Sequence, residues 1–164
     1  MAFLSYTELN TVCAAAATAV TQYPPVYSSF LPDLYNTGCR PNELTDKTLW
    51  TPIGGGFFEL QPLKGNNVRV ISESALSSYF VEWISGGTQL YENCTYSKQK
   101  QIWRVKNAYP QIYCVKKPMD LYLYRYRYVK HLDLIGMTSE EIQTEMGWTN
   151  AEMVDQYVSA PLEW

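Results

Sequence analysis

Two arginines, a lysine and a tyrosine stand in sequence contexts suited to chemistry on a phosphate diester: Arg40, Arg125, Lys64 and Tyr157. A guanidinium offers a planar fork of donors that matches phosphate oxygens. A tyrosine hydroxyl has a pKa of about 10, so it becomes a useful nucleophile only where positive charge favours the phenolate. A lysine ammonium gives up its proton more readily than a guanidinium and can act as a general acid. Such a set can cleave a phosphodiester without a metal ion.

The context of the tyrosine is the most specific of these. Residues 138–141 and 149–152 both fit the S/T-x-x-E capping box, which predicts that two short helices begin there. Trp148 follows a glycine between these helices, and Tyr157 comes nine residues after Trp148. One tyrosine among 14 carries little information by itself. Its offset from a Gly-Trp pair makes Tyr157 the preferred candidate, whereas Trp148 also suits an ordinary core position.

The candidate cations occupy three further contexts. Residues 37–44 read TGCRPNEL, so Arg40 lies between a helix-ending glycine and a helix-opening proline, where it could also simply pair with Glu43. Arg125 ends the segment Tyr-Leu-Tyr-Arg, and Arg127 competes with it for the same role. Lys64 lies in a predicted turn, where an ordinary hairpin-tip lysine is an equally good interpretation.

These motifs together resemble the catalytic domain of the tyrosine recombinases, the phage-integrase family. That family shows a T-G-x-R-x-x-E-L pattern, a lysine in a β-turn, an H-x-x-R motif, a histidine or tryptophan after a glycine, and a tyrosine nucleophile. The resemblance implies that Arg40 and Arg125 clamp the scissile phosphate and that Trp148 donates its indole N–H to it. It further implies that Lys64 protonates the leaving 5′ oxygen and that Tyr157 forms a 3′-phosphotyrosyl intermediate.

The sequence departs from the family pattern in two respects. Tyr122 stands where the H-x-x-R motif has histidine; it can donate a hydrogen bond to phosphate but cannot act as a base near neutral pH. Residues 1–164 are expected to form one catalytic-type domain without the N-terminal core-binding (clamp) domain that a typical integrase carries. His131, which lies where the family often has a structural histidine, is given no catalytic role.

Charge is distributed unevenly along the chain. The net charge is −3, yet residues 64–130 carry 11 basic and 4 acidic side chains, whereas residues 131–164 carry 7 acidic side chains and no Lys or Arg. A basic middle between acidic ends could present a cationic face to double-stranded DNA, although scattered and cancelling surface charges would give the same totals. The candidate DNA-binding residues of this region are Lys98, Lys100, Arg104 and Lys106.

The cysteine and histidine content and the apolar runs of the sequence bear on cofactor use and on cellular location. The four cysteines are spread singly and there is one histidine, so we expect no metal site and no cofactor. No apolar run has the length of a membrane span and no basic segment precedes the apolar stretch near the N-terminus. We therefore expect a cytoplasmic protein that is not secreted and does not enter a membrane, and whose partners are DNA and possible further protomers on it.

The elements that must position these side chains are mostly helical. Helices are predicted over 7–20, from Pro24–Pro25 to Gly38, directly after Arg40, and over 74–84, 95–107 and 120–134, followed by the two capped helices. Residues 49–53, 57–61 and 68–71 read as short strands separated by glycine- and asparagine-rich turns. The predicted fold class is a mainly helical α+β domain with a small three-stranded antiparallel sheet, like that of a tyrosine recombinase catalytic domain.

Three functions are compatible with these patterns. The first is DNA strand cleavage and rejoining by a tyrosine recombinase from a phage or mobile element. The second is a DNA-binding or recombination-assembly factor that keeps the fold without cleaving, which the substitution at Tyr122 and the acidic balance favour. The third is a helical protein-interaction domain with no role in nucleic-acid chemistry.

Overall fold

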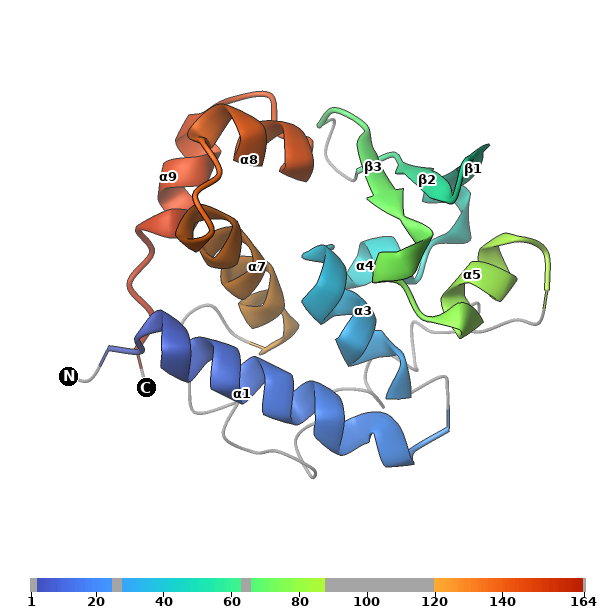
Figure 1. Ribbon diagram of the computed structural model, residues 1–164, viewed down its shortest axis with the longest axis horizontal. Helices are drawn as coiled ribbons and strands as arrows, with labels where there is room; N and C mark the ends of the chain where they lie inside the picture. Colours follow the sequence, from blue (N-terminus) through green and yellow to red (C-terminus); the bar gives the residue numbers. More distant parts are fainter. Residues whose placement is uncertain (1–2, 25–27, 63–65, 88–119, 164) are drawn as a thin grey trace.

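The computed structural model describes residues 3–24, 28–62, 66–87 and 120–163. Figure 1 shows the helices gathered around a central pair, formed by residues 30–37 and 123–134, with the strands at one side of the molecule. Within the described ranges no helix is both long enough and apolar enough to cross a membrane. The α-helices are α1 (Tyr6–Ala19), α3 (Phe30–Thr37), α4 (Pro41–Leu44), α5 (Ser78–Ile84), α7 (Leu123–Leu134), α8 (Ser139–Met146) and α9 (Glu152–Val158).

The short elements complete this arrangement. The strands are β1 (Trp50–Gly54), β2 (Phe57–Leu60) and β3 (Arg69–Ser72), and they form one antiparallel sheet in the order β1-β2-β3. Turns of 3-10 helix are η1 (Val20–Gln22), η2 (Lys47–Leu49), η4 (Glu73–Ala75) and η6 (Asp120–Tyr122). The predicted fold class, a mainly helical α+β domain with a small antiparallel sheet, is confirmed.

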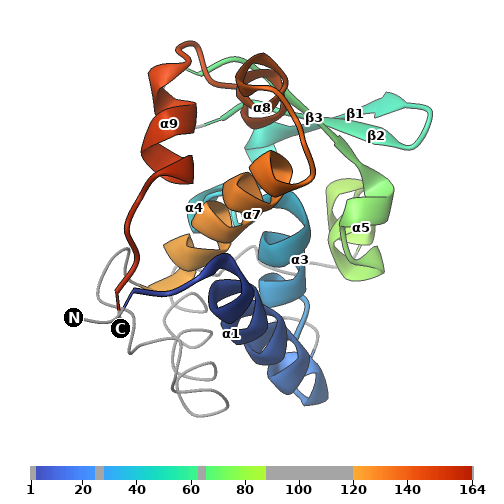
Figure 2. The same ribbon diagram turned by 60° about the vertical axis from the view of Figure 1, so that its left-hand side comes forward.

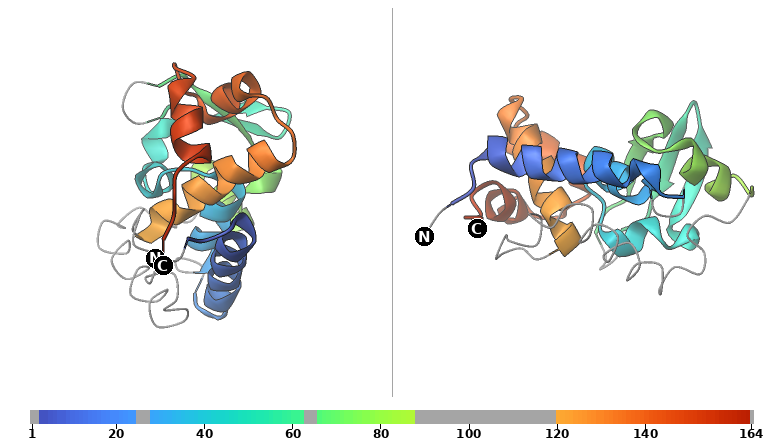
Figure 3. Two further views of the ribbon diagram at one scale, coloured as in Figure 1. Left: turned by 90° about the vertical axis from the view of Figure 1, so that its left-hand side faces the viewer. Right: turned by 90° about the horizontal axis from the view of Figure 1, so that it is seen from below.

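Helix α7 is the centre of the fold. It contacts α1 and α3 through one part of its surface and α8 and α9 through another. Figures 2 and 3 show α9 alongside α7, with the last described residues returning toward α1. There Phe3 and Glu163 form an isolated antiparallel bridge, and Lys130 of α7 donates hydrogen bonds to the Val158 and Ala160 carbonyl oxygens at 2.7 and 3.1 Å.

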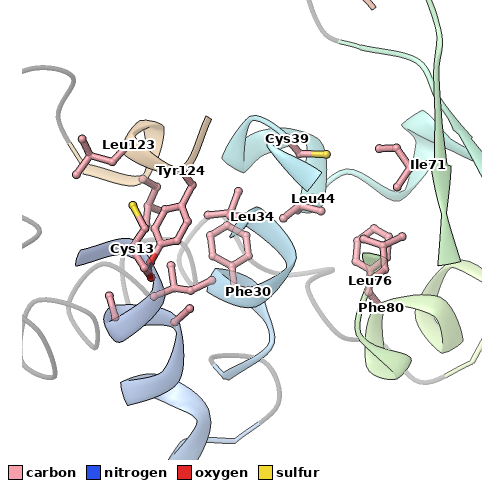
Figure 4. Packing of buried hydrophobic residues seen from close by; sticks show 14 of the residues in the cluster. Cys13, Phe30, Leu34, Cys39, Leu44, Ile71, Leu76, Phe80, Leu123 and Tyr124 are labelled. Atoms are coloured by element: carbon pink, nitrogen blue, oxygen red, sulfur yellow. Dashed lines mark hydrogen bonds between the residues drawn. The ribbon is translucent and has the colours of Figure 1, made fainter. Parts of the chain in front are cut away.

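Two apolar clusters hold these elements together. The first cluster joins α1, α3, the sheet, α5 and the start of α7; Figure 4 shows Phe30 and Leu34 of α3 beside Tyr124 of α7 and Cys13 of α1. The Tyr124 hydroxyl also donates to the Cys13 carbonyl oxygen at 3.0 Å. The second cluster joins α7, α8 and α9, and its buried members are Val129, Leu132, Ile142, Met146, Trp148, Val154 and Tyr157.

Two helices begin differently from the sequence prediction, and two other predicted helices are described only in part or not at all. The helix predicted over 74–84 begins only at Ser78, because the Asp33 carboxylate accepts the Ser77 amide and hydroxyl at 2.7 and 3.0 Å and fixes Ser77 as an extended N-cap. Helix α9 lacks the predicted capping box, since Asn150 Oδ1 instead accepts the Glu152 amide at 2.6 Å. Helix α3 is described from Phe30 and ends at Gly38 as predicted, whereas the helix predicted over 95–107 lies outside the described residues.

Candidate active site

Arg40 is placed by a sharp turn at the end of α3. Gly38 has a φ of 65° and follows the last residue of that helix. A Cβ at Gly38 would lie 2.5 Å from Cδ1 of Tyr128, so both the backbone conformation and the close packing require glycine. Arg40 then becomes the N-cap of α4, and its amide donates to Glu43 Oε1 at 2.7 Å. Its Nη1 lies 3.5 Å from Glu43 Oε2, so the pairing with Glu43 that the sequence left open is present.

Arg125 reaches the same carboxylate from the first turn of α7. Its Nη1 donates to the Gly38 carbonyl oxygen at 2.8 Å and lies 3.9 Å from Glu43 Oε1. Arg125 and Glu43 are each only 1% exposed. Burial, followed by the positive charge of Arg40, lowers the pKa of Arg125 from its usual value. Two guanidinium groups are therefore held close together with one carboxylate between them.

Arg127, the competing arginine, lies elsewhere. Its two terminal nitrogens donate to Asn10 Oδ1 and to the Tyr35 carbonyl oxygen, and its guanidinium stacks 3.7 Å from the centre of the Tyr35 ring. These partners belong to α1 and α3. Of the two candidates on α7, the structure brings Arg125 and not Arg127 to Arg40.

Trp148 and Tyr157, from the C-terminal part of the chain, complete this buried group of side chains, which we call the pocket. Helix α8 ends at Gly147 with a φ of 71°, and the chain then buries Trp148 to 1% exposure. Tyr157, in the last turn of α9, places its ring centroid 5.0 Å from that of Trp148. The Arg125 Cζ lies 5.5 Å from the centre of the Trp148 ring and 5.8 Å from that of the Tyr157 ring. Arg40, Arg125, Trp148 and Tyr157 thus converge from three separate parts of the chain.

Three buried donor atoms in this pocket make no hydrogen bond to the described residues: Arg40 Nη1, whose ion pair with Glu43 is too long for one, Arg125 Nε and Trp148 Nε1. Buried polar atoms in native proteins are nearly always hydrogen-bonded, and leaving one unpaired costs about 1–3 kcal/mol. All three are donors, and two of them carry positive charge. The arrangement is therefore suited to an anionic ligand that supplies several acceptor oxygens.

Of the other predicted site residues, only Tyr122 lies within the described part of the chain. It is 38% exposed in η6, and no hydrogen bond to another described residue places it at the pocket. His131 stacks on Tyr6, and its Nδ1 lies 3.0 Å from the Tyr6 hydroxyl. Across the described part of the chain, no three His, Cys, Asp or Glu side chains gather as a metal site would require. The predicted residues that lie outside the described ranges are Lys64, Lys98, Lys100, Arg104 and Lys106.

Sequence reasoning missed Arg69, the third buried arginine of this region. Arg69 of β3 is 1% exposed; its Nε donates to the Glu145 carbonyl oxygen at 2.8 Å and its Nη2 donates to that of Thr37 at 2.6 Å. These carbonyls belong to the last turns of α8 and α3, where the helix dipole favours positive charge. Each of these helices is followed by its glycine and then by a pocket residue, Arg40 or Trp148. One guanidinium therefore fixes the spacing between the two loops.

A backbone contact reinforces this link. The Asn67 amide donates to the Gly147 carbonyl oxygen at 2.8 Å, and a Cβ at Gly147 would lie 2.4 Å from the Asn67 carbonyl oxygen. The segment that leads into β3 is thus attached to the loop that carries Trp148. A possible signal for Arg69 was its place two residues before Ile71 in a strand with alternate buried positions, but an arginine there normally reads as solvent-exposed.

The comparisons with known proteins agree with this architecture. No protein-family model and no curated protein matches the sequence. Among solved structures, the crystal structure of XerA recombinase is similar to this chain with a TM-score of 0.59 at 18% sequence identity. The match covers 96% of this chain and 60% of that chain, so the protein spans about three-fifths of the length of this neighbour. The chain therefore has the fold of a tyrosine-recombinase-like catalytic domain.

Proposed function

We propose that this protein cleaves and rejoins DNA strands through a 3′-phosphotyrosyl intermediate, in the manner of a tyrosine recombinase. The observation that carries the proposal is that Arg40, Arg125 and Trp148 each hold a buried donor atom without a hydrogen bond to the described residues, while Arg125 and Trp148 pack against the Tyr157 ring. Arg40 and Arg125 share one buried carboxylate, Glu43, and the positive charge of Arg69 also acts on Arg125, so positive charge is in excess. A scissile phosphate would supply the missing negative charge and acceptors.

The chemistry follows from the placement of these groups. The Tyr157 oxygen attacks phosphorus and gives up its proton to solvent water, and the bond from phosphorus to the 5′ oxygen breaks. The departing oxygen takes up a proton, which we assign to Lys64, and becomes a free 5′ hydroxyl. Arg40, Arg125 and the Trp148 indole N–H hold the non-bridging oxygens while negative charge accumulates on them. Attack by a 5′ hydroxyl from a partner strand reverses these steps and restores Tyr157.

DNA recognition by this domain would depend largely on phosphate contacts. Residues 64–130 supply 11 of the 13 basic side chains, with Lys98, Lys100, Arg104 and Lys106 as the proposed contacts. Binding should therefore weaken steeply with salt, because each neutralised phosphate releases counterions. Further protomers bound to the same DNA would carry out the exchange of the second strand. We propose a cytoplasmic role in site-specific recombination or integration of a phage or mobile element.

The decisive experiment traps the covalent intermediate. A pool of nicked suicide duplexes with randomised sequence around the nick is incubated with the protein, and denaturing electrophoresis detects protein that retains labelled DNA. We expect an adduct with the native protein and none with Tyr157→Phe. Tyr79→Phe serves as the matched control because Tyr79 of α5 is 48% exposed and lies outside the pocket. A native protein that binds these duplexes but never forms an adduct would contradict the proposal.

A DNA-binding or recombination-assembly factor is the second candidate. Its support is Tyr122, which replaces the motif histidine and is 38% exposed in η6. The same experiment separates the two functions. Salt-sensitive retention of duplex DNA without an adduct would favour this candidate, and the absence of any retention would favour a protein-interaction domain.

A further inference from the structure

Among the described residues, Tyr126 makes the closest ring contact with the proposed nucleophile. The ring centroids of Tyr126 and Tyr157 lie 4.4 Å apart, with 33° between the ring planes. Tyr126 follows Arg125 directly on α7 and is half-buried. Trp148 also packs on the Tyr157 ring, at 5.0 Å and 32°. The Tyr157 ring is therefore in contact with two aromatic rings that belong to different elements.

Helix α9 has little means of fixing Tyr157 by itself. It has 7 residues, and its N-cap residue Ala151 makes no side-chain capping bond. Helices this short are marginal in water, and their last turns fray. Tyr157 is the residue before the last one of α9. Its position must therefore come from packing against α7 and against the loop that carries Trp148.

Tyr126 is well suited to supply that packing. It is partly buried against the first cluster, formed by α1, α3, the sheet and α5, and also against the second cluster of α7, α8 and α9. The side chain is therefore supported from the body of the domain while its ring contacts Tyr157. We infer that Tyr126 is a positioning residue that holds the ring of Tyr157 in place for attack on the phosphate, an inference that rests on the proposed function.

The chemistry of the Tyr126 hydroxyl agrees with a positioning role rather than a nucleophilic one. Burial, followed by the neighbouring Tyr157 hydroxyl, raises the pKa of Tyr126 above its usual value. Tyr126 therefore stays neutral near neutral pH and is poorly suited to act as a nucleophile. Tyr126 should contribute through its ring, so a phenylalanine at this position should preserve its effect on Tyr157.

The first test compares Tyr126→Leu with Tyr126→Phe in single-turnover cleavage of the suicide duplexes at saturating DNA. The interaction free energy of such an aromatic pair corresponds to a rate factor of about twofold to tenfold. Tyr126→Leu should therefore slow adduct formation by that factor. Tyr126→Phe should stay within about twofold of the native protein. A loss of folding alone would lower the final amount of adduct and leave the rate constant of the folded fraction unchanged. Equal rate constants for Tyr126→Leu and the native protein would overturn the inference.

The second test does not depend on cleavage. N-acetylimidazole acetylates accessible tyrosine hydroxyls, and peptide mass spectrometry follows the rate at Tyr157, which is 9% exposed, and at Tyr79, which is 48% exposed. Tyr126→Leu should accelerate acetylation of Tyr157 while Tyr79 reacts at its native rate. An unchanged rate at Tyr157 would overturn the inference. Failure of the native protein to form a DNA adduct would instead reject the proposed function, and acetylation would still show whether Tyr126 holds Tyr157.

Discussion

Glu43→Gln offers a direct test of the charge arrangement in the pocket. The Glu43 carboxylate lies 3.5 Å from Arg40 Nη1 and 3.9 Å from Arg125 Nη1, and it is 1% exposed. At an effective dielectric constant of about 20, each of these attractions amounts to roughly 4–5 kcal/mol, and desolvation of the carboxylate offsets much of the gain. Removal of one partner from a buried charge pair costs about 3–5 kcal/mol in practice. The glutamine keeps the carbonyl that accepts the Arg40 amide, so we expect a loss of about 2–4 kcal/mol.

Urea denaturation at neutral pH measures this loss, and the chain supplies a matched control. Glu141 occupies the same third position of a helix, with the Thr138 amide donating to its Oε1 at 3.3 Å, but its side chain is exposed and no described arginine pairs with it. Glu141→Gln should cost less than about 0.5 kcal/mol. The reasoning would be refuted if Glu43→Gln destabilised the protein no more than Glu141→Gln.

The same substitution should change how the protein responds to anions. Without Glu43, the guanidinium groups of Arg40 and Arg125 lose their shared carboxylate, so an oxyanion that enters the pocket meets a larger excess of positive charge. Inorganic sulfate should therefore raise the unfolding temperature of Glu43→Gln more than that of the native protein at equal ionic strength, as any ligand of the folded state does. An equal or smaller increase would place the anion site elsewhere.

Three further predictions concern the residues that shape or border the pocket. Arg69→Met should lower the free energy of unfolding in urea by about 2–5 kcal/mol, because two helix-terminal carbonyls lose their donor; a loss below about 1 kcal/mol would contradict this role. Gly147→Ala should destabilise the protein well beyond the cost of about 1–2 kcal/mol expected for Gly136→Ala, since both glycines have positive φ but only the Gly147 Cβ would meet neighbouring atoms. Burial, with a smaller effect of Arg127, lowers the pKa of His131 below 6.5, so the unfolded chain takes up this proton more readily than the folded one. Stability should therefore fall as the pH drops below about 6.5, and His131→Gln should lose less stability over that range than the native protein; equal losses would argue against this shift.

Local signals in the sequence were enough to predict most of the helices and strands. The helix end at Gly38, the capping box at Thr138 and the three short strands each rest on a few adjacent residues, and the structure contains all of them. The start of α5 was misplaced because it depends on Asp33, which is distant in sequence. A capping motif was wrongly assigned at Thr149 because Asn150 offers a competing local hydrogen bond.

The pocket residues were predicted only as separate motifs. Their convergence depends on Arg69, whose hydrogen bonds reach two helix ends far away in the sequence, and no local pattern reveals such a link. The contact between Tyr126 and Tyr157 likewise arises from the packing of α9 on α7. The catalytic roles assigned to Arg40, Lys64, Arg125, Trp148 and Tyr157 stay predictions until cleavage is measured.

The central claim is that Tyr157, and no other tyrosine, becomes joined to DNA. Trypsin cleaves after Lys130, and the peptide 131–164 that follows contains neither Lys nor Arg and only one tyrosine, Tyr157. Tyr126 and Tyr128 fall on other tryptic peptides because Arg127 and Lys130 follow them. After nuclease digestion of the trapped adduct, we expect mass spectrometry to find a nucleotide 3′-phosphate on peptide 131–164. A nucleotide on any other peptide, or on none, would contradict the account.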